Sequence, residues 1–229
     1  MVTTLQAATE GLGVYSIAEA ARYARMPVAT LNRWFFGNGH QPMRSPGIES
    51  TKGKRITFID FVETLAIRSL RADHQISLQK IKEAIHNARE HYGIVRPFAH
   101  REHRTVLIGK DLHIFLRGDS NPVGLTGKDS GQKSMTPCIE AYMKDLEFDS
   151  EGLARLYRAY CHKDQNVVLD PKLHFGEPTL ESCGFTAETL WRAAVAEGSI
   201  VRAAEIYEVP VEAVETAYRY WNQELGVAA

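Results

Sequence analysis

The sequence predicts a mainly α-helical fold with a small β component, and three observations support this prediction. A short motif typical of two helices joined by a tight turn occurs twice, at residues 16–28 and at residues 199–211. Apolar side chains recur at the 3.6-residue spacing of a helix within residues 77–92. Two apolar runs within residues 105–116 flank Gly109, as in a β-hairpin. We therefore expect an N-terminal winged helix-turn-helix, an α+β connector and a C-terminal three-helix helix-turn-helix module.

The repeated motif keeps the same internal spacing in both copies. Each copy has a Ser-Ile pair, an Ala-Ala pair and a Pro-Val pair, beginning at Ser16 in the first and at Ser199 in the second. A serine hydroxyl accepts a hydrogen bond from an unpaired amide in the first turn of a helix. A proline starts a second helix without the loss of a backbone donor. This is the layout of a helix-turn-helix, whose second helix is offered to the major groove of DNA.

The first copy opens the predicted N-terminal domain, residues 14–92. Ser16 and Glu19 have the spacing of a capping box, and the second helix is expected from Pro27 to about Phe36. Its inner face is expected to carry Val28, Leu31 and either Trp34 or Phe35. The glycine- and proline-rich stretch 37–55, followed by the β-prone residues 56–58, predicts a wing. Two further helices are expected, at about 61–71 and at 77–92, the latter ended by Gly93.

The connector is expected to span residues 93–165. It contains the hairpin at residues 105–116, and the segment 118–134, rich in Gly, Ser, Asn and Lys, predicts a loop. Thr136 and Pro137 are expected to start a helix that runs to about Lys144. Alternation in residues 153–160 predicts a strand. The C-terminal helical domain is expected at residues 166–226.

The N-terminal and C-terminal parts of the chain differ in net charge. The whole chain has 27 Lys and Arg against 28 Asp and Glu, but residues 14–92 have 12 against 7 and residues 136–229 have 8 against 16. A basic segment suits nucleic acid, whereas an acidic one suits protein. The second motif carries the acidic residues Glu205, Glu208, Glu212 and Glu215. These carboxylates would repel a phosphate backbone, so only the first motif is expected to bind DNA.

The candidate DNA contacts lie in the first motif and in the wing. From the second helix we assign Ala29, Thr30, Asn32 and Arg33, because an arginine can pair with guanine and an asparagine with adenine. Basic wing residues would neutralise phosphates. The remaining candidates are Tyr15, Arg44, Lys52, Lys54 and Arg55. The alternative is that these residues form an ordinary solvated surface.

The second motif offers aromatic residues to a partner. Aromatic side chains dominate the binding energy of many interfaces. The candidates for a partner or dimer interface are Tyr207, Tyr218, Tyr220 and Trp221. Sequence alone leaves open which of them fill the core.

The sequence contains no pattern typical of other classes of function. The three cysteines are widely spaced, which argues against a disulfide framework or a cysteine-rich zinc site. His100 and His103 lie beside arginines that disfavour a second cation, so no metal site and no cofactor are predicted. No nucleophile–base pairing or phosphate-binding loop is visible, so no enzymatic activity is expected. The chain also lacks a signal-peptide or membrane-spanning pattern, and we expect a cytoplasmic protein.

Residues 14–92 resemble the winged DNA-binding domain of MerR-type regulators. The resemblance rests on Tyr15-Ser16-Ile17, on Thr30 to Trp34, on Ile56 to Leu65 and on Ile76 to Ile81, in that order. In this chain Pro27 stands where the family has a polar residue, and Asn32 replaces a common arginine. The resemblance implies an operator-binding regulator, but its base preference does not transfer.

The C-terminal part resembles the domain of unknown function 433 found in VapB-like antitoxins. The resemblance rests on Asp170-Pro171, on Gly176-Glu177-Pro178 and on the helix-turn-helix that ends in Tyr220-Trp221. Together the two resemblances imply an antitoxin-like repressor that binds operator DNA as a homodimer and neutralises a PIN-domain ribonuclease toxin. The alternative is a stand-alone MerR-like transcription regulator whose C-terminal region senses a ligand or a protein.

Overall fold

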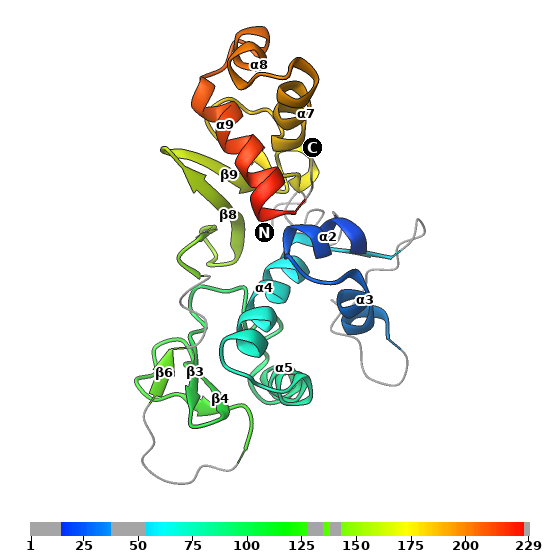
Figure 1. Cartoon of the computed structure of the whole chain (residues 1–229). Helices are drawn as coiled ribbons and strands as arrows, with labels where there is room; N and C mark the ends of the chain where they lie inside the picture. The colour runs from blue at the N-terminus through cyan, green and yellow to red at the C-terminus, as the bar shows by residue number, and fades with distance from the viewer. Residues whose placement is uncertain (1–14, 38–53, 128–134, 138–142, 227–229) are drawn as a thin grey trace. The chain divides into compact units, whose positions relative to one another are not determined.

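The structure is a computed structural model that describes residues 15–37, 54–127, 135–137 and 143–226 (Figure 1). The described residues form an α+β structure of helices and small antiparallel sheets. The chain divides into two compact units. Unit 1 combines residues 1–58 with residues 156–229, and unit 2 comprises residues 59–155.

The N-terminal segment of unit 1 contains two helices and a two-stranded ribbon. Its elements are β1 (Tyr15–Ser16), α2 (Ile17–Tyr23), α3 (Val28–Phe36) and β2 (Arg55–Ile56). Strands β1 and β2 pair antiparallel, with Tyr15 opposite Ile56. The predicted capping box is confirmed: the Glu19 amide donates to the Ser16 hydroxyl at 3.2 Å, and the Ser16 amide donates to the Glu19 carboxylate at 2.7 Å. The rest of the predicted wing, residues 38–53, lies outside the described residues.

Helix α3 buries one face and exposes the other. Leu31, Trp34 and Phe35 are buried, as the helical spacing predicts. The prediction was wrong for Val28, whose side chain is 50% exposed. Val28 is the first residue of α3, so the helix has no preceding turn to cover it.

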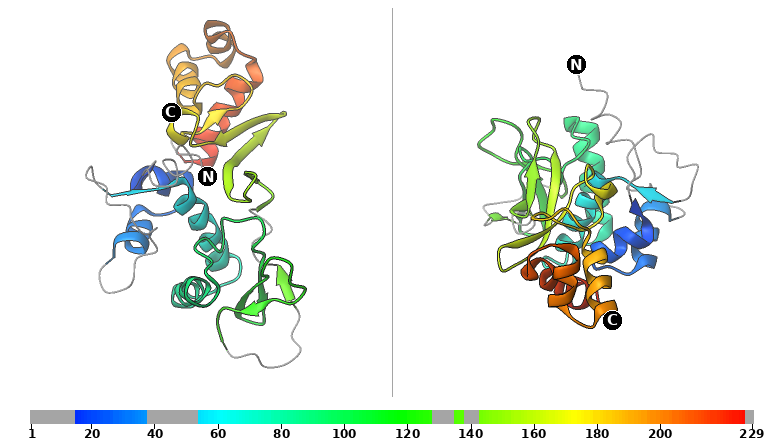
Figure 2. Two further views of the ribbon diagram at one scale, coloured as in Figure 1. Left: turned by 180° about the vertical axis from the view of Figure 1, so that it is seen from behind. Right: turned by 90° about the horizontal axis from the view of Figure 1, so that it is seen from above.

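The C-terminal segment of unit 1 packs helices against a small sheet (Figures 1 and 2). The strands are β8 (Ala154–His162), β9 (Gln165–Leu169) and β10 (Thr179–Leu180), and the helices are η1 (His174–Gly176), α7 (Ala187–Glu197), α8 (Ile200–Tyr207), α9 (Val211–Arg219) and η2 (Tyr220–Glu224). Strand β9 pairs with both β8 and β10. Thr186 and Ser199 cap α7 and α8 through their hydroxyls. The predicted three-helix arrangement is therefore present in residues 187–219.

Unit 2 contains two helices and a four-stranded sheet. The elements are α4 (Phe58–Ala72), α5 (Leu78–Tyr92), β3 (Thr105–Ile108), β4 (Asp111–Ile114), β5 (Val123–Gly124), β6 (Met135–Pro137) and β7 (Leu146–Phe148). The sheet has the order β5-β4-β3-β6, and β7 belongs to the sheet ordered β10-β9-β8-β7. Both ends predicted for α5 are confirmed: Ser77 caps its start, and Gly93, with φ of 66°, ends it. The predicted hairpin is β3–β4.

Four predictions of the fold need correction. Thr136 and Pro137 do not start a helix but lie in β6, which pairs with β3. Val123 and Gly124 interrupt the predicted loop with a strand paired to β4. Helix α4 begins at Phe58, three residues before the predicted start. The described chain also holds more sheet than a mainly α-helical fold implies, because β8 and β9 form a long hairpin. None of its helices is long and apolar enough to cross a bilayer.

A buried ionic cluster joins α4 to the segment that follows α5. The Arg96 guanidinium lies 2.9 Å from the Asp60 carboxylate and 3.5 Å from that of Glu63. Both carboxylates are buried. Burial raises the pKa of Glu63 from 4.5 to about 7, although the charge of Arg96 opposes the shift. The positive charge of Arg96 thus lies closer to the Asp60 carboxylate than to the Glu63 carboxylate, and it stabilises the ionised form of Glu63 less well.

Replacing Glu63 with glutamine is expected to flatten the pH dependence of unfolding. Between the ordinary carboxyl pKa of 4.5 and about 7, the folded state holds a proton that the unfolded state has lost. The free energy of unfolding of the wild type therefore falls as pH rises through this window, by on the order of 1.4 kcal/mol per pH unit. Glu63→Gln removes this pH-dependent fall in the free energy of unfolding. Urea unfolding of the wild type and the variant at pH 5 and pH 8 measures the difference. The exposed Glu83→Gln is the control, and an equal slope in wild type and Glu63→Gln would contradict the assignment.

Candidate nucleic-acid interface

The outer face of α3 carries polar and small side chains without an acidic residue. Ala29 and Arg33 are exposed, and Thr30 and Asn32 are half-buried. The turn before α3 is tight, because Arg25 adopts a left-handed conformation with φ of 52° and the Met26 amide bonds to the Ala21 carbonyl at 2.8 Å. This turn sets α3 at an angle to α2 and leaves its first turns facing solvent. The four residues predicted from the second helix thus lie on a surface that DNA could reach.

Lys54 links the β1–β2 ribbon to the outer face of α3. Its ammonium donates to the Asn32 side-chain oxygen at 3.0 Å and lies 5.4 Å from the centroid of the Phe36 ring. In the part of the chain that the structure describes, neither Arg33 nor Lys54 makes an ion pair. Arg55 is exposed beside Lys54 in β2. Arg33, Lys54 and Arg55 therefore form one cationic surface, which we call the α3–β2 surface.

The contact with Lys54 changes the role expected of Asn32. Recognition of adenine by asparagine uses both the amide donor and the carbonyl acceptor. In the structure the acceptor is already bonded to Lys54. Asn32 thus orients the lysine, while its amide nitrogen remains a donor. This contact joins residues 22 positions apart, and sequence spacing gave no sign of it.

Tyr15 does not lie on this surface. Its side chain is 2% exposed, and its hydroxyl donates to the Gly176 carbonyl at 2.9 Å. Burial raises its pKa well above the ordinary value. The hydroxyl thus stabilises unit 1 internally, so the prediction that Tyr15 contacts DNA was wrong. The other two predicted contacts, Arg44 and Lys52, lie outside the described residues.

A second contact also joins the two segments of unit 1. The Arg25 guanidinium lies 2.5 Å from the Glu224 carboxylate. Tyr220, whose ring is buried, is close enough to Tyr23 and Arg25 for each to shift its pKa. The first helix-turn-helix is therefore held to the C-terminal segment of unit 1 by polar contacts that include those of Tyr15 and Arg25.

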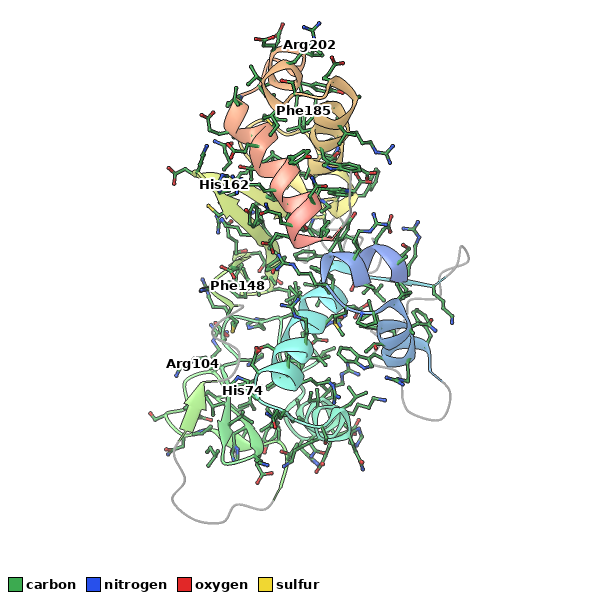
Figure 3. All side chains as sticks on the ribbon, viewed as in Figure 1. His74, Arg104, Phe148, His162, Phe185 and Arg202 are labelled. Carbon is green, nitrogen blue, oxygen red and sulfur yellow. The ribbon has the colours of Figure 1, made fainter. Side chains whose placement is uncertain are left out.

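The second helix-turn-helix has the acidic surface that its sequence predicts, with one exception. Glu205, Glu208 and Glu212 are exposed. Glu215 instead accepts hydrogen bonds from Lys163 at 2.7 Å and from Arg219 at 3.1 Å. These two bonds lower the pKa of Glu215 to about 2, and the bond from Lys163 has the larger effect. His162, labelled in Figure 3, lies 3.4 Å from the same carboxylate, which therefore belongs to a mixed-charge cluster.

The four predicted interface aromatics separate into core and surface residues. Tyr220 and Trp221 are 1% and 2% exposed, so they fill the core. Tyr207 is half-buried and packs edge-on against Phe185, with ring centroids 5.3 Å apart. Tyr218 is also half-buried and lines an open groove. Only Tyr207 and Tyr218 keep surface to offer a partner.

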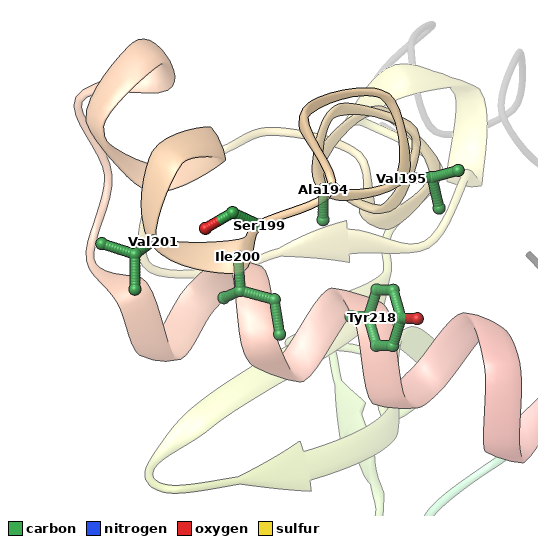
Figure 4. A pocket seen from close by; sticks show the side chains of 7 residues that line it. Ala194, Val195, Ser199, Ile200, Val201 and Tyr218 are labelled. Carbon is green, nitrogen blue, oxygen red and sulfur yellow. The ribbon is translucent and has the colours of Figure 1, made fainter.

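The groove lies between the end of α7, the start of α8 and the last turn of α9 (Figure 4). Its volume is about 460 Å³, and it is lined by Ala194, Val195, Gly198, Ser199, Ile200, Val201 and Tyr218. The Ser199 hydroxyl is occupied by the cap of α8, where it accepts from the Arg202 amide at 3.3 Å. The lining is otherwise apolar apart from the Tyr218 hydroxyl, and the described residues hold no cluster of His, Cys, Asp or Glu suited to a metal ion. The groove therefore suits apolar side chains.

The chain is similar to a known protein in sequence and to a solved structure in fold. No family model matches the chain. The chain is 26% identical, over 190 residues, to a Mycobacterium tuberculosis protein named "Putative antitoxin VapB45", and the match covers 75% of this chain and 78% of that protein. It is also similar to the crystal structure of Rv2018 from Mycobacterium tuberculosis, with a TM-score of 0.59 and 23% identity over 90% of this chain and 97% of that one. The structural likeness shows a shared fold, and the sequence likeness is to a protein whose name is that of a putative antitoxin.

Proposed function

We propose that this protein is an antitoxin-like transcriptional repressor. In this proposal the first helix-turn-helix and its ribbon form a MerR-like winged domain that binds operator DNA, and the chain also neutralises a PIN-domain ribonuclease toxin. The observation that carries the DNA-binding part is the α3–β2 surface, where Arg33, Lys54 and Arg55 are exposed, Lys54 contacts Asn32 of α3, and α3 has no acidic residue. The toxin-binding part is supported by the sequence similarity to the Mycobacterium tuberculosis protein named "Putative antitoxin VapB45".

The proposed repressor acts as a homodimer. One short recognition helix makes few contacts, and helix-turn-helix proteins gain affinity by binding two half-sites about one helical turn apart. A dimer would place two α3–β2 surfaces on one operator. The acidic residues Glu205, Glu208 and Glu212 would keep the second motif away from the phosphates.

A salt-titrated shift assay with the promoter DNA of the protein's own operon tests the first part. Arg33 and Lys54 of both copies give four phosphate contacts in a dimer, which predicts that the logarithm of affinity falls with the logarithm of salt concentration with a slope of roughly −4. Equal affinity for unrelated DNA, or a slope near zero, would contradict operator recognition by this surface.

Co-purification with the product of the neighbouring gene tests the second part. We expect a stable complex that suppresses the ribonuclease activity of a PIN-domain partner. A chain that binds its operator but captures no such partner would favour the stand-alone regulator instead.

A further inference from the structure

Helix α9 of the second helix-turn-helix corresponds to α3 of the first. Both helices span nine residues, and when Ser16 is aligned with Ser199, Arg33 of α3 is aligned with Thr216 of α9. Arg33 is exposed, whereas Thr216 is buried, with its hydroxyl 3.2 Å from the His162 carbonyl of β8. The β8–β9 hairpin therefore covers, on α9, the face that α3 leaves exposed. In this arrangement α9 does not offer that face to a groove of DNA.

The outer side of α8 and the start of α9 remain exposed. Val201 and Ile206 on α8 are 53% and 55% exposed, and Val211 is the exposed first residue of α9. Val201 also lines the groove of about 460 Å³ at the start of α8 (Figure 4). Glu205 follows Val201 by one helical turn and Glu208 by two, so both lie on the Val201 side of α8. What we call the α8–α9 surface consists of Val201, Glu205, Ile206, Glu208, Val211 and Glu212.

The negative charge of this surface is not balanced by neighbouring cations. Residues 194–219 contain five glutamates and two arginines. Both arginines pair locally, Arg202 with Glu197 at 3.3 Å and Arg219 with Glu215 at 3.0 Å. Lys163 of the hairpin turn also pairs with Glu215, at 2.7 Å. The carboxylates without a cation partner among the described residues are those of Glu205, Glu208 and Glu212. The surface therefore keeps three uncompensated negative charges.

The composition of the α8–α9 surface determines which class of partner suits it. Nucleic acid and membrane surfaces are both anionic, so the uncompensated carboxylates repel them. Exposed apolar side chains beside carboxylates suit a protein segment with basic and apolar side chains. We propose that a basic segment of a partner protein binds the α8–α9 surface and places an apolar side chain in the groove. The inference rests on the proposed function, since it assigns that segment to the toxin.

Reversal of charge on α8 tests the proposal. We expect the combined Glu205→Lys and Glu208→Lys replacement to raise the dissociation constant of the complex with the neighbouring gene product by about 30-fold or more, because like charges would then face each other. The wild-type association rate is expected to fall as salt is added, and the variant is expected to lose this dependence. Surface plasmon resonance with the full chain at several salt concentrations measures both quantities. Lysine is favoured near the C-terminus of a helix, so the variant is expected to fold.

The matched control replaces Glu83 and Glu90 with lysine. Both are exposed on α5, and their replacement changes the net charge by the same amount. The control is expected to bind the neighbouring gene product as the wild type does. Circular dichroism verifies that both variants are folded.

Val201→Asp tests the groove separately from charge. This variant adds a negative charge, so a surface that acts by charge alone would bind a basic segment more tightly. We expect instead a dissociation constant about 10-fold higher or more, because an apolar contact is lost. Val95→Asp is the control, since Val95 is 49% exposed and Val201 53%.

Three results would overturn the proposal. The first is capture of the neighbouring gene product that survives both the charge reversal on α8 and Val201→Asp. The second is tighter operator binding by the charge-reversed chain, because the surface would then face DNA. The third is dissociation of its homodimer, measured by light scattering, because a second copy would then cover the surface. If the wild type captures no such product, the toxin-binding part of the proposed function fails as well. If the wild type and all variants capture it alike, only the assignment of this surface fails.

Discussion

Replacing both Arg33 and Lys54 with glutamate is expected to lower operator affinity by about 100-fold or more. Each good contact to a base is worth about 1–3 kcal/mol of discrimination, and each cation removed from phosphate also loses its released counterion. Lys54→Glu further breaks the bond to Asn32, which leaves that side chain without its partner at the surface. A salt-titrated shift assay with operator DNA measures the loss.

The control for this prediction is an equally exposed arginine elsewhere in unit 1. Arg192 lies on α7, where it pairs with Glu188, and Arg192→Glu changes the net charge by the same amount per residue. Exposed ion pairs contribute about 0–1 kcal/mol to stability, so the control is expected to fold. If Arg192→Glu weakened operator binding as much, per residue replaced, as the double replacement of Arg33 and Lys54, affinity would follow the net charge of the chain rather than the α3–β2 surface.

Local signals in the sequence were enough to place most helix ends. The Ser16–Glu19 capping box, the Ser77 cap and the left-handed Gly93 all depend on residues within one helical turn, and the structure contains all three. The turn at Gly109 likewise depends on its immediate neighbours. Such signals can be read without knowledge of the rest of the fold.

Long-range pairing accounts for the errors. Pro137 is compatible with the first turn of a helix, but it is equally compatible with an edge strand, where its missing amide donor is tolerated. In the sheet order β5-β4-β3-β6 it lies on such an edge, opposite Val106. Only the partner strand 31 positions earlier decides between these states.

The candidate site shows the same limit. Ala29 and Arg33 could be assigned to the exposed face of α3 from helical spacing alone. Tyr15 could not be assigned correctly, because its hydroxyl partner is 161 positions away in the other segment of unit 1. The contact between Lys54 and Asn32 was also missed, because these two residues are 22 positions apart in the sequence.

Replacing Trp221 with alanine is expected to destabilise unit 1 by about 3–5 kcal/mol, the usual cost of truncating a buried aromatic residue. The Trp221 ring stacks on Trp191, with centroids 5.8 Å apart and planes 29° apart, and Tyr220 lies 6.4 Å away. The Trp191 indole donates to the Asn222 side-chain oxygen at 2.9 Å, which ties α7 to the turn after α9. Loss of the Trp221 ring leaves a cavity beside this contact, so α7 and the turn after α9 both lose packing contacts.

Urea unfolding followed by circular dichroism measures this loss, and the exposed Val95→Ala is the control that should unfold like the wild type. The comparison separates the core and interface roles that sequence alone left open for Trp221. A core residue lowers the unfolding midpoint at every protein concentration. An interface residue changes the dissociation constant of the dimer while the isolated chain keeps its stability. A stable but monomeric Trp221→Ala chain would therefore assign this ring to the interface, against its burial in the core.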